Sequence, residues 1–537
     1  MSDLCSISVG RPFGQNRIMT DFTTIADIPR IQARQRPNDI ALWFEGRTTT
    51  YAQLDEASNR CANALIAAGV KPGDRVACMS KNDDEFFTYW MGAAKARACL
   101  APVNWRLAPP EAAFVINDTD ASVMICGQAF VDVLDTILAD CPSLKHLIQV
   151  EPGHPRWPSL QGWIGKFPAT DPGLKALDDD DVIQLYTSGT TGLPKGVQLT
   201  NQNYNVLFTC GVEAGWARYE VGDVLLAAMP LFHVAGCNLG ALGLLQGTKV
   251  VVLREIDPAV ILRLIPEHKV NHAFLAPVVI NMVLQAPGCK ETDFSSLRRI
   301  FYGASPISEA VLLAAKAQFG CSFTQLYGLT ETIGGGCVLT PEDHDHRPDK
   351  LRACGQPWPG FEVRVRNGDT PAGVMEVGEI EIRSPGVMKG YWKRPEATAE
   401  AIDAEGWFKS GDAGYFDADG YLFIHDRVKD MIVTGGENVY PAEVENAVYS
   451  HPSVADAAVI GVPDDKWGEA VKAVVVLRPG FEPDAAGIIA HCRGLIAGYK
   501  VPKSVDFAET LPRNPSGKVL RRELRKTFWE GRTRMVG

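Results

Sequence analysis

The chain has 537 residues, of which 46% are hydrophobic and 22% charged, as in ordinary globular proteins of several domains. Its formal net charge is -11 and its pI is about 5.5. This acidic balance argues against nucleic acid as the main partner, because binding many phosphates needs a basic excess. A small anionic ligand needs only a local positive site and is not excluded.

Cysteine usage and the amino terminus indicate the compartment. The 13 cysteines are scattered from Cys5 to Cys492 without a C-x-x-C pair, which is typical of buried thiols under reducing conditions. The first residues lack a basic region followed by an apolar one, so we expect no signal peptide. Segment 239–253 is the most apolar, but Gln246 and Lys249 interrupt it, and a membrane span needs about 18 apolar residues. We expect a cytoplasmic enzyme.

The first part of the chain predicts strands that alternate with helices. Thr50 is a candidate N-cap for an amphipathic helix that Gly69 can end. A strand at RVACMS, a helix at 83–98 and a strand at CLAPVN follow, and the alternation recurs over 223–253 and 270–321. This spacing predicts parallel sheets wound by crossover helices.

The pattern changes in the last third of the chain. Short alternating strands between 357 and 391 predict a small antiparallel, barrel-like unit, and YFDADGYLFIHDR predicts a hairpin. A new series of strands and helices begins near Asp430. We therefore predict an α/β fold with three parts: a large N-terminal domain of doubly wound parallel sheets plus the barrel-like unit (1–427), a hinge (428–430) and a small mobile α+β C-terminal domain (431–537).

A glycine-rich loop, YTSGTTGLPKG at 186–196, suggests phosphate binding. Its order differs from the Walker pattern G-x-x-x-x-G-K-[ST], and Pro194 and Gly196 beside Lys195 disfavour a helix start there. Strand-like runs flank the loop, so its amides and hydroxyls can fold around an anion. Composition alone leaves a mobile surface loop as an equal alternative.

This loop and five other motifs resemble the adenylate-forming acyl-CoA synthetases, which are related to firefly luciferases and peptide-synthetase adenylation domains. The other motifs, in the family's order, are PLFHVAG (230–236), YGLTE (327–331), SGD (410–412), DRVKDMIVTGGENVYP (426–441) and PRNPSGK (512–518). The resemblance implies two steps. A carboxylate attacks the α-phosphate of ATP to give acyl-adenylate and pyrophosphate, and a thiol, usually that of CoA, then displaces AMP.

The resemblance implies catalytic roles for four residues. Lys518 is expected to be the cation of the first step, since charge builds on the transferring phosphate. Glu331 is expected to bind Mg²⁺, which prefers hard oxygen ligands, and Thr330 to contact a phosphate oxygen. His233 is expected to position the acid at the α-phosphate rather than to act as a general base.

The resemblance also implies a nucleotide site. Tyr327 is expected to offer a flat face to adenine, with a core aromatic as the alternative. Asp412 is expected to accept hydrogen bonds from the ribose hydroxyls, and Arg427 to support the same ribose or form a rim ion pair. The expected ATP and AMP contacts are Thr187, Ser188, Gly189, Thr190, Thr191, Gly192, Lys195, Gly303, Ala304, Ser305, Tyr327, Gly328, Thr330, Asp412 and Arg427.

In this family the small domain rotates between the two steps, and the pivot matches Lys429. Lys518 would then leave the site while Gly435 and Gly436 approach the pantetheine arm of CoA. Trp467 and Tyr499 are expected to stack on the CoA adenine, with ordinary surface aromatics as an equal alternative.

The acyl pocket is expected to consist mostly of small or apolar residues: His233, Val234, Asn238, Tyr302, Gly303, Gly334, Gly335 and Gly336. No lysine or aspartate is placed to bind an ammonium group or a second carboxylate. This favours a hydrophobic monocarboxylic acid, first a medium- or long-chain fatty acid. A coumarate-, feruloyl- or benzoate-type acid is the alternative, because the glycines leave room for a flat ring.

Three other segments are predicted to have no role in the reaction. His268 and His272 have metal-like spacing, but their run passes from a helix end to a strand, so we expect no metal there. Segment 342–350 is predicted to be a polar loop. The basic segment 521–534 is predicted to be a solvated helix, with CoA phosphates or a membrane surface as alternative contacts.

We also expect the protein to form a homodimer.

Other function classes fit less well. The chain ends 19 residues after Lys518 (537 minus 518), so we expect no carrier domain of a peptide synthetase. Luciferase activity uses the same adenylation motifs and stays open. The missing Walker order disfavours a P-loop NTPase. Lys518, Glu331 and Asp412 disfavour a nucleotide-binding protein without catalysis.

Overall fold

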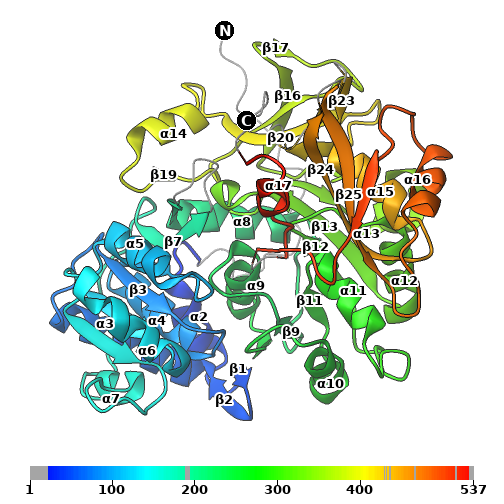
Figure 1. Ribbon diagram of the computed structural model, residues 1–537. Coiled ribbons are helices and arrows are strands. Elements are labelled where there is room, and N and C mark those ends of the chain that lie inside the picture. Colours follow the sequence, from blue (N-terminus) through cyan, green and yellow to red (C-terminus); the bar gives the residue numbers. More distant parts are fainter. Residues whose placement is uncertain are drawn as a thin grey trace, which may run out of the picture.

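The computed structural model describes residues 22–187, 194–427, 430, 432–434, 437–464, 467–514 and 517–530, with the backbone alone for 425–427, 437 and 438. The chain forms a large N-terminal domain and a smaller C-terminal domain, which holds the orange and red elements of Figure 1. Within the described parts, no helix has the length and apolar character needed to cross a membrane.

A nine-stranded sheet forms one side of the large domain, in the order β15-β14-β13-β12-β11-β9-β10-β1-β2. Its central strands are parallel, and β2, β14 and β15 add antiparallel edges. The strands are β1 (Ile40–Phe44), β2 (Arg47–Thr50), β9 (Val224–Ala227), β10 (Lys249–Val252), β11 (His272–Phe274), β12 (Arg299–Gly303), β13 (Ser322–Gly328), β14 (Gly336–Leu339) and β15 (Gln356–Pro357).

A seven-stranded sheet forms the other side, in the order β19-β8-β7-β4-β3-β5-β6. Strands β3 to β7 pair in parallel, and β8 and β19 are antiparallel additions. They are β3 (Arg75–Met79), β4 (Cys99–Pro102), β5 (Val123–Cys126), β6 (His146–Gln149), β7 (Asp181–Thr187), β8 (Lys195–Thr200) and β19 (Gly390–Tyr391). The predicted doubly wound parallel sheets are therefore confirmed in the centres of both sheets.

Two helices, α4 (Glu85–Lys95) and α9 (Val234–Leu245), are buried on almost every side because they lie between the sheets. They touch at Gly240, where an added Cβ would lie 2.4 Å from Cζ of Phe87. The other helices of this domain are α2 (Asp27–Gln35), α3 (Tyr51–Ala67), α5 (Pro109–Thr119), α6 (Val131–Ile137), α7 (Leu160–Ile164), α8 (Asn201–Glu213), α10 (Pro258–His268), α11 (Pro277–Gln285), α12 (Glu309–Phe319), α13 (Pro341–His346) and α14 (Pro395–Ala401).

Helix α3 begins and ends where the sequence predicts. Thr50 Oγ1 accepts a hydrogen bond from the Gln53 amide at 3.2 Å, and Gln53 Oε1 accepts one from the Thr50 amide at 2.8 Å. This reciprocal pair is a capping box. Gly69 follows the helix with φ +89°, a left-handed conformation that glycine adopts without strain.

A third, antiparallel sheet of β17-β16-β18-β20-β21 confirms the predicted change of pattern. Its strands are β16 (Glu362–Asn367), β17 (Thr370–Pro371), β18 (Gly378–Arg383), β20 (Phe408–Phe416) and β21 (Leu422–Arg427). Asp417 Oδ1 closes the predicted hairpin turn by accepting hydrogen bonds from the amides of Asp419 and Tyr421.

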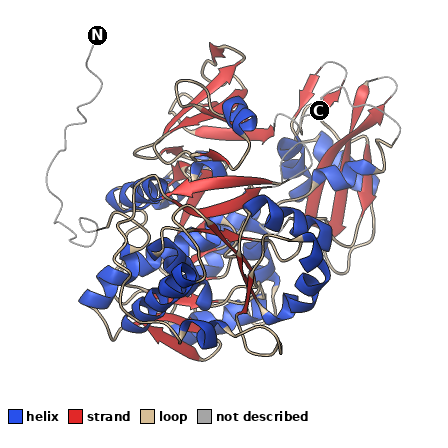
Figure 2. Ribbon diagram, turned by 90° about the vertical axis from the view of Figure 1, so that its left-hand side faces the viewer, coloured by secondary structure: helices blue, strands red, loops and turns tan. Residues whose placement is uncertain are grey.

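The C-terminal domain has a sheet and an apolar core of its own, and Figure 2 shows its strands as a separate group beside the main body. The strands are β22 (Ile432–Thr434), β23 (Glu437–Val439), β24 (Val454–Asp464), β25 (Gly468–Leu477) and β26 (Ser504–Phe507). The helices are α15 (Pro441–Tyr449), α16 (Ala485–Arg493) and α17 (Arg521–Lys526). A separate small α+β domain is thus confirmed.

Segment 342–350 corrects a prediction. It is not a polar loop but forms most of α13 and a 3₁₀ turn, Pro348–Lys350. Thr340 caps the helix by accepting a hydrogen bond from the Asp343 amide at 3.2 Å, and Pro341 occupies the first helical position. His344 is buried, with Nδ1 2.7 Å from the Thr340 carbonyl oxygen and Nε2 2.8 Å from the Tyr302 hydroxyl.

The histidine pair and the basic segment 521–534 were also predicted from the sequence. His268 ends α10 and His272 begins β11, so they do not share a helix face, as predicted. The basic segment does contain a helix, α17, but that helix is not simply solvated. Arg521 pairs with Glu445 at 2.8 Å, and Arg525 with Asp430 at 2.9 Å, because α17 packs on β24.

Candidate active site

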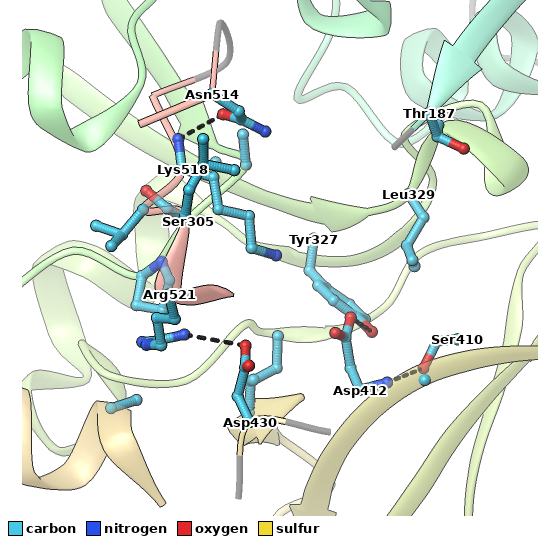
Figure 3. Close-up of a pocket in the computed structure, with 18 of the residues that line it drawn as sticks. Thr187, Ser305, Tyr327, Leu329, Ser410, Asp412, Asp430, Asn514, Lys518 and Arg521 are labelled. Carbon is cyan, nitrogen blue, oxygen red and sulfur yellow. Dashed lines mark hydrogen bonds and ion pairs between the residues drawn. The ribbon is translucent and has the colours of Figure 1, made fainter. Parts of the chain in front are cut away.

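A cavity of about 2110 Å³ is lined by residues of both domains. The large domain contributes Thr187, Tyr327, Glu331 and Asp412, and the small domain contributes Lys518. Figure 3 shows Lys518, Tyr327 and Asp412 around one space, with Thr187 at its far side. Motifs separated by hundreds of residues therefore meet, as the resemblance implies.

Backbone hydrogen bonds shape the loop that carries Lys518. The Lys518 amide donates to Asn514 Oδ1, and the Asn514 amide donates to the Lys518 carbonyl, both at 2.7 Å. Gly517 has φ +86°, and a Cβ there would lie 2.6 Å from Cγ1 of Val278 on α11. The loop is thus docked closely on the large domain, and only glycine fits at this contact.

Tyr327 and Asp412 form a hydrogen-bonded pair in the cavity wall. The Tyr327 hydroxyl donates to Asp412 Oδ2 at 3.0 Å, and the Asp412 amide donates to Ser410 Oγ at 3.0 Å. Burial first, and then the Asp412 charge, raises the pKa of Tyr327 well above its usual value. Tyr327 therefore stays a donor, which fixes the carboxylate. Arg427 lies opposite Asp412 in the strand register, but its side chain is outside the described part.

Glu331 lies in a 3₁₀ turn, Thr330–Thr332, beside the end of β7. Its Oε1 accepts hydrogen bonds from the Tyr391 hydroxyl at 2.9 Å and the Thr187 hydroxyl at 3.4 Å. Its carbonyl accepts the Met388 amide at 2.7 Å. Thr330 lines the same cavity. The carboxylate is therefore buried and held from two sides.

Strands β7 and β8 carry the predicted phosphate loop, with Thr187 opposite Lys195 in the antiparallel register. Lys195 begins a strand, not a helix, as the sequence predicts. Both residues line the cavity, and Nζ of Lys195 lies 4.8 Å from the centre of the Tyr391 ring. The loop residues Ser188, Gly189, Thr190, Thr191 and Gly192 lie outside the described residues.

His233 is the N-cap residue of α9 and lines the cavity. Its Nε2 is buried and has no hydrogen-bond partner among the described residues. Burial first, and then the charge of Arg106, lowers the pKa of His233 to about 4. The imidazole is thus neutral near pH 7 and a weak base. The helix amino terminus beside it favours a carboxylate through its partial positive charge.

Of the remaining predicted pocket residues, only some face the cavity. Gly303, Ala304, Ser305, Gly328 and Val234 line it. Ala304 adopts φ +67°, a strained conformation for a residue other than glycine, at the end of β12. Gly334 has φ +84°, and its nearest neighbour on the Cβ side is Val234 at 4.0 Å.

Four of the predicted pocket residues pack against other described residues of the protein. Asn238 donates to the Ile333 carbonyl and accepts from the Tyr204 hydroxyl. Tyr302 is fully buried and bonds to Gln325 and His344. A Cβ on Gly335 would lie 2.2 Å from Phe361, and one on Gly336 would lie 2.8 Å from the Tyr327 carbonyl oxygen. The expected free room at 335 and 336 is therefore filled by protein.

The predicted CoA residues either do not line the cavity or fall outside the described part. Trp467 and Tyr499 are 45% and 41% exposed on the small domain. The pivot Lys429 and the pair Gly435 and Gly436 lie outside the described residues.

Sequence reasoning missed several cavity residues. Asn104, Arg106 and Leu107 follow β4, Ile307 follows β12, and Leu326 is part of β13. A sequence pattern could have indicated the segment after β4, because loops at the carboxyl ends of parallel strands collect ligand contacts. Tyr391 on β19 offered no such signal, since a two-residue edge strand has no periodicity.

Comparisons with known proteins agree with this geometry. The family model described as AMP-binding enzyme matches residues 30–392, and the model of the AMP-binding enzyme C-terminal domain matches residues 443–518. The fatty acid–[acyl-carrier-protein] ligase ScoC of Streptomyces coeruleorubidus is 40% identical over 519 residues, 96% of this chain and 98% of that protein. The long-chain-fatty-acid–CoA ligase FadD13 of Mycobacterium tuberculosis is 37% identical, covering 93% and 96%. The feruloyl-CoA synthase of Amycolatopsis sp is 39% identical, covering 93% and 98%.

Solved structures show the same fold. The Mycobacterium tuberculosis fatty acyl CoA synthetase has a TM-score of 0.74 and 36% identity, covering 95% of this chain and 99% of that one. The anthranilate CoA ligase AuaEII, in complex with anthranoyl-AMP, has a TM-score of 0.87 and 28% identity, covering 95% and 98%.

Proposed function

The chain belongs to the AMP-binding enzyme family as an AMP-forming acid–CoA ligase, and we propose that its acid is a hydrophobic monocarboxylic acid, first a medium- or long-chain fatty acid. The observation that carries the choice of acid is the apolar part of the cavity lining. The same cavity that His233 lines is also lined by Val234, Ala235, Pro306, Ile307, Leu326 and Leu329. A neutral imidazole and these apolar side chains suit an acid with one charge and an apolar tail.

In the first step, the chain's residues hold ATP and the acid in line. Asp412, fixed by Tyr327, accepts the ribose hydroxyls, and Tyr327 covers the adenine. His233 and the start of α9 orient the carboxylate toward the α-phosphate, which favours reaction by proximity. Lys518 supplies positive charge where charge develops on the phosphate. Thr187, Thr330 and Lys195 hold the outgoing pyrophosphate.

We also propose Mg²⁺ as the metal and Glu331 as its protein ligand. No cluster of three or more His, Cys, Asp or Glu side chains suited to a metal occurs among the described residues. Mg²⁺ usually binds one or two carboxylates together with substrate phosphates and water, and Glu331 supplies one buried carboxylate in the cavity lining. When bound, the ion neutralises phosphate charge. Glu331 holds it.

For the second step, we propose the rotation of residues 431–537 about 428–430, with Lys429 as pivot. It would move Lys518 away and bring Gly435 and Gly436 to the thiol arm, with Trp467 and Tyr499 on the CoA adenine. Trp467 and Tyr499 are exposed, as a contact made only after rotation requires. A homodimer and a cytoplasmic location are part of the same proposal.

A screen of pyrophosphate release tests the choice of acid. Octanoate, decanoate and palmitate are compared with ferulate, benzoate and an amino acid, each with ATP and without thiol. We expect release with the fatty acids. Preference for ferulate or benzoate would favour the aryl alternative, for which the feruloyl-CoA synthase similarity speaks. If none of the acids gives pyrophosphate release, a non-catalytic nucleotide-binding protein would instead be favoured. A second series with CoA or holo-acyl carrier protein identifies the thiol.

A further inference from the structure

Tyr391 is a residue that none of the motifs includes, yet it lies where three elements meet. Its backbone pairs with Val197 on β8, and the next residue, Trp392, donates its amide to the Gly196 carbonyl at 2.7 Å. The Tyr391 amide itself donates to Thr398 Oγ1 at 2.9 Å. Hydrogen bonds thus hold the backbone of this short strand, so the direction of the Tyr391 side chain is fixed.

The two ends of this side chain make different contacts. The hydroxyl donates to Glu331 Oε1 at 2.9 Å, and the ring lies under Nζ of Lys195 at 4.8 Å. One side chain therefore touches the carboxylate proposed to bind the metal and the lysine that ends the phosphate loop.

We propose that Tyr391 is a positioning residue that holds the Glu331 carboxylate toward the metal and the Lys195 ammonium toward the phosphates. This rests on the proposed function of Glu331. Hydrogen-bond donors to a ligating carboxylate fix its orientation, and their loss typically costs roughly 10–100-fold in metal affinity or activity. A cation–π contact adds a weaker, separate contribution at the ring face.

Two variants separate the two contacts. Tyr391→Phe removes the hydroxyl and keeps the ring, whereas Tyr391→Leu removes both. Tyr421→Phe is the matched control, because the Tyr421 hydroxyl also donates to a carboxylate, Asp343, at 2.6 Å, and Tyr421 lies outside the cavity lining. Thr187→Val removes a second hydroxyl that contacts Glu331 and gives an independent variant should Tyr391→Phe fold poorly.

The first readout is calorimetric binding of ATP with and without Mg²⁺, which needs no turnover. Wild type should bind ATP more tightly with Mg²⁺. Tyr391→Phe should lose roughly tenfold or more of that Mg²⁺-dependent gain while binding ATP alone normally. Tyr391→Leu should in addition bind ATP alone roughly two- to fivefold more weakly. Thr187→Val should reduce the Mg²⁺-dependent gain as well.

The second readout divides the reaction. Tyr391→Phe should raise the Mg²⁺ concentration for half-maximal pyrophosphate release by roughly 10–100-fold, yet convert supplied acyl-AMP and CoA to thioester at the wild-type rate. Unchanged Mg²⁺ dependence, equal loss in both half-reactions, or the same shift in Tyr421→Phe would overturn the proposal. If wild type releases no pyrophosphate with any acid, the proposed function fails, and calorimetry still decides the role of Tyr391.

Discussion

Gly517 offers a direct test of whether the Lys518 loop must dock on the large domain for the first step. Its φ is +86°, and an added Cβ would meet Cγ1 of Val278 at 2.6 Å, far inside ordinary van der Waals contact. Val278 is β-branched, so its methyl group cannot easily turn away. Gly517→Ala should therefore weaken the docked position of the loop.

The expected free-energy cost of Gly517→Ala has two parts. A left-handed conformation costs about 1–2 kcal/mol for a residue with a Cβ, and it applies wherever the loop keeps its shape. Overpacking against Val278 costs about 1–3 kcal/mol and applies only to the docked position. The second part alone lowers the docked population, and so the adenylation rate, by roughly 5- to 150-fold.

Two half-reactions and a double variant measure the effect of Gly517→Ala on docking. Pyrophosphate release should fall in Gly517→Ala, whereas thioester formation from supplied acyl-AMP should stay within about twofold, because the loop has left the site in the proposed second step. Val278→Ala should restore part of the loss in the double variant, since it removes the clash but not the backbone strain. Equal loss in both half-reactions, or no recovery with Val278→Ala, would refute the docking argument.

Three other predictions concern catalysis, packing and pH. Lys518→Ala should reduce pyrophosphate release roughly 10²–10³-fold and spare thioester formation from acyl-AMP, and equal loss would remove its assigned role. Gly240→Ala should lower the free energy of unfolding by about 1–3 kcal/mol in urea titrations, because its Cβ would lie 2.4 Å from Phe87, and no loss would contradict the close helix contact. Burial lowers the pKa of His344 to about 4, so folding excludes a proton that the unfolded chain binds below about pH 6.5. Wild type should therefore lose up to about 1.4 kcal/mol per pH unit relative to His344→Gln between pH 6.5 and 4, and parallel urea curves across that range would contradict this.

The sequence predicted those parts of the fold that local chemistry determines. The capping box of Thr50 and the turn at Asp417 each depend on side chains within a few positions, and both helix and hairpin form as expected. Alternation of strands and helices likewise indicated parallel sheets. The antiparallel addition β19 was not predicted, because its partner β8 lies far away in the chain.

Tertiary contacts explain the errors. Segment 342–350 is rich in polar residues and was predicted to be a loop, but His344 turns inward to Tyr302 and makes α13 part of the core. The arginines of α17 were predicted to be solvated, but Glu445 of α15 and Asp430 of the predicted hinge, both distant in the chain, pair with them.

The site, like the fold, was predicted only in part from the sequence. Motif residues such as Asp412, Glu331 and Lys518 do line one cavity. Gly335 had suggested open space, whereas Phe361 and Trp358 occupy it from a loop that no spacing rule connects to it. Tyr391 was missed because its contacts with Glu331 and Lys195 arise only in the folded structure.

Acid-dependent exchange of labelled pyrophosphate into ATP, measured without any thiol, tests the central claim most directly. The account predicts exchange with a hydrophobic monocarboxylic acid and Mg²⁺, together with acyl-AMP bound to the enzyme, because adenylation is a complete and reversible first step. Exchange that needs CoA, or release of ADP and phosphate in place of pyrophosphate, would contradict it.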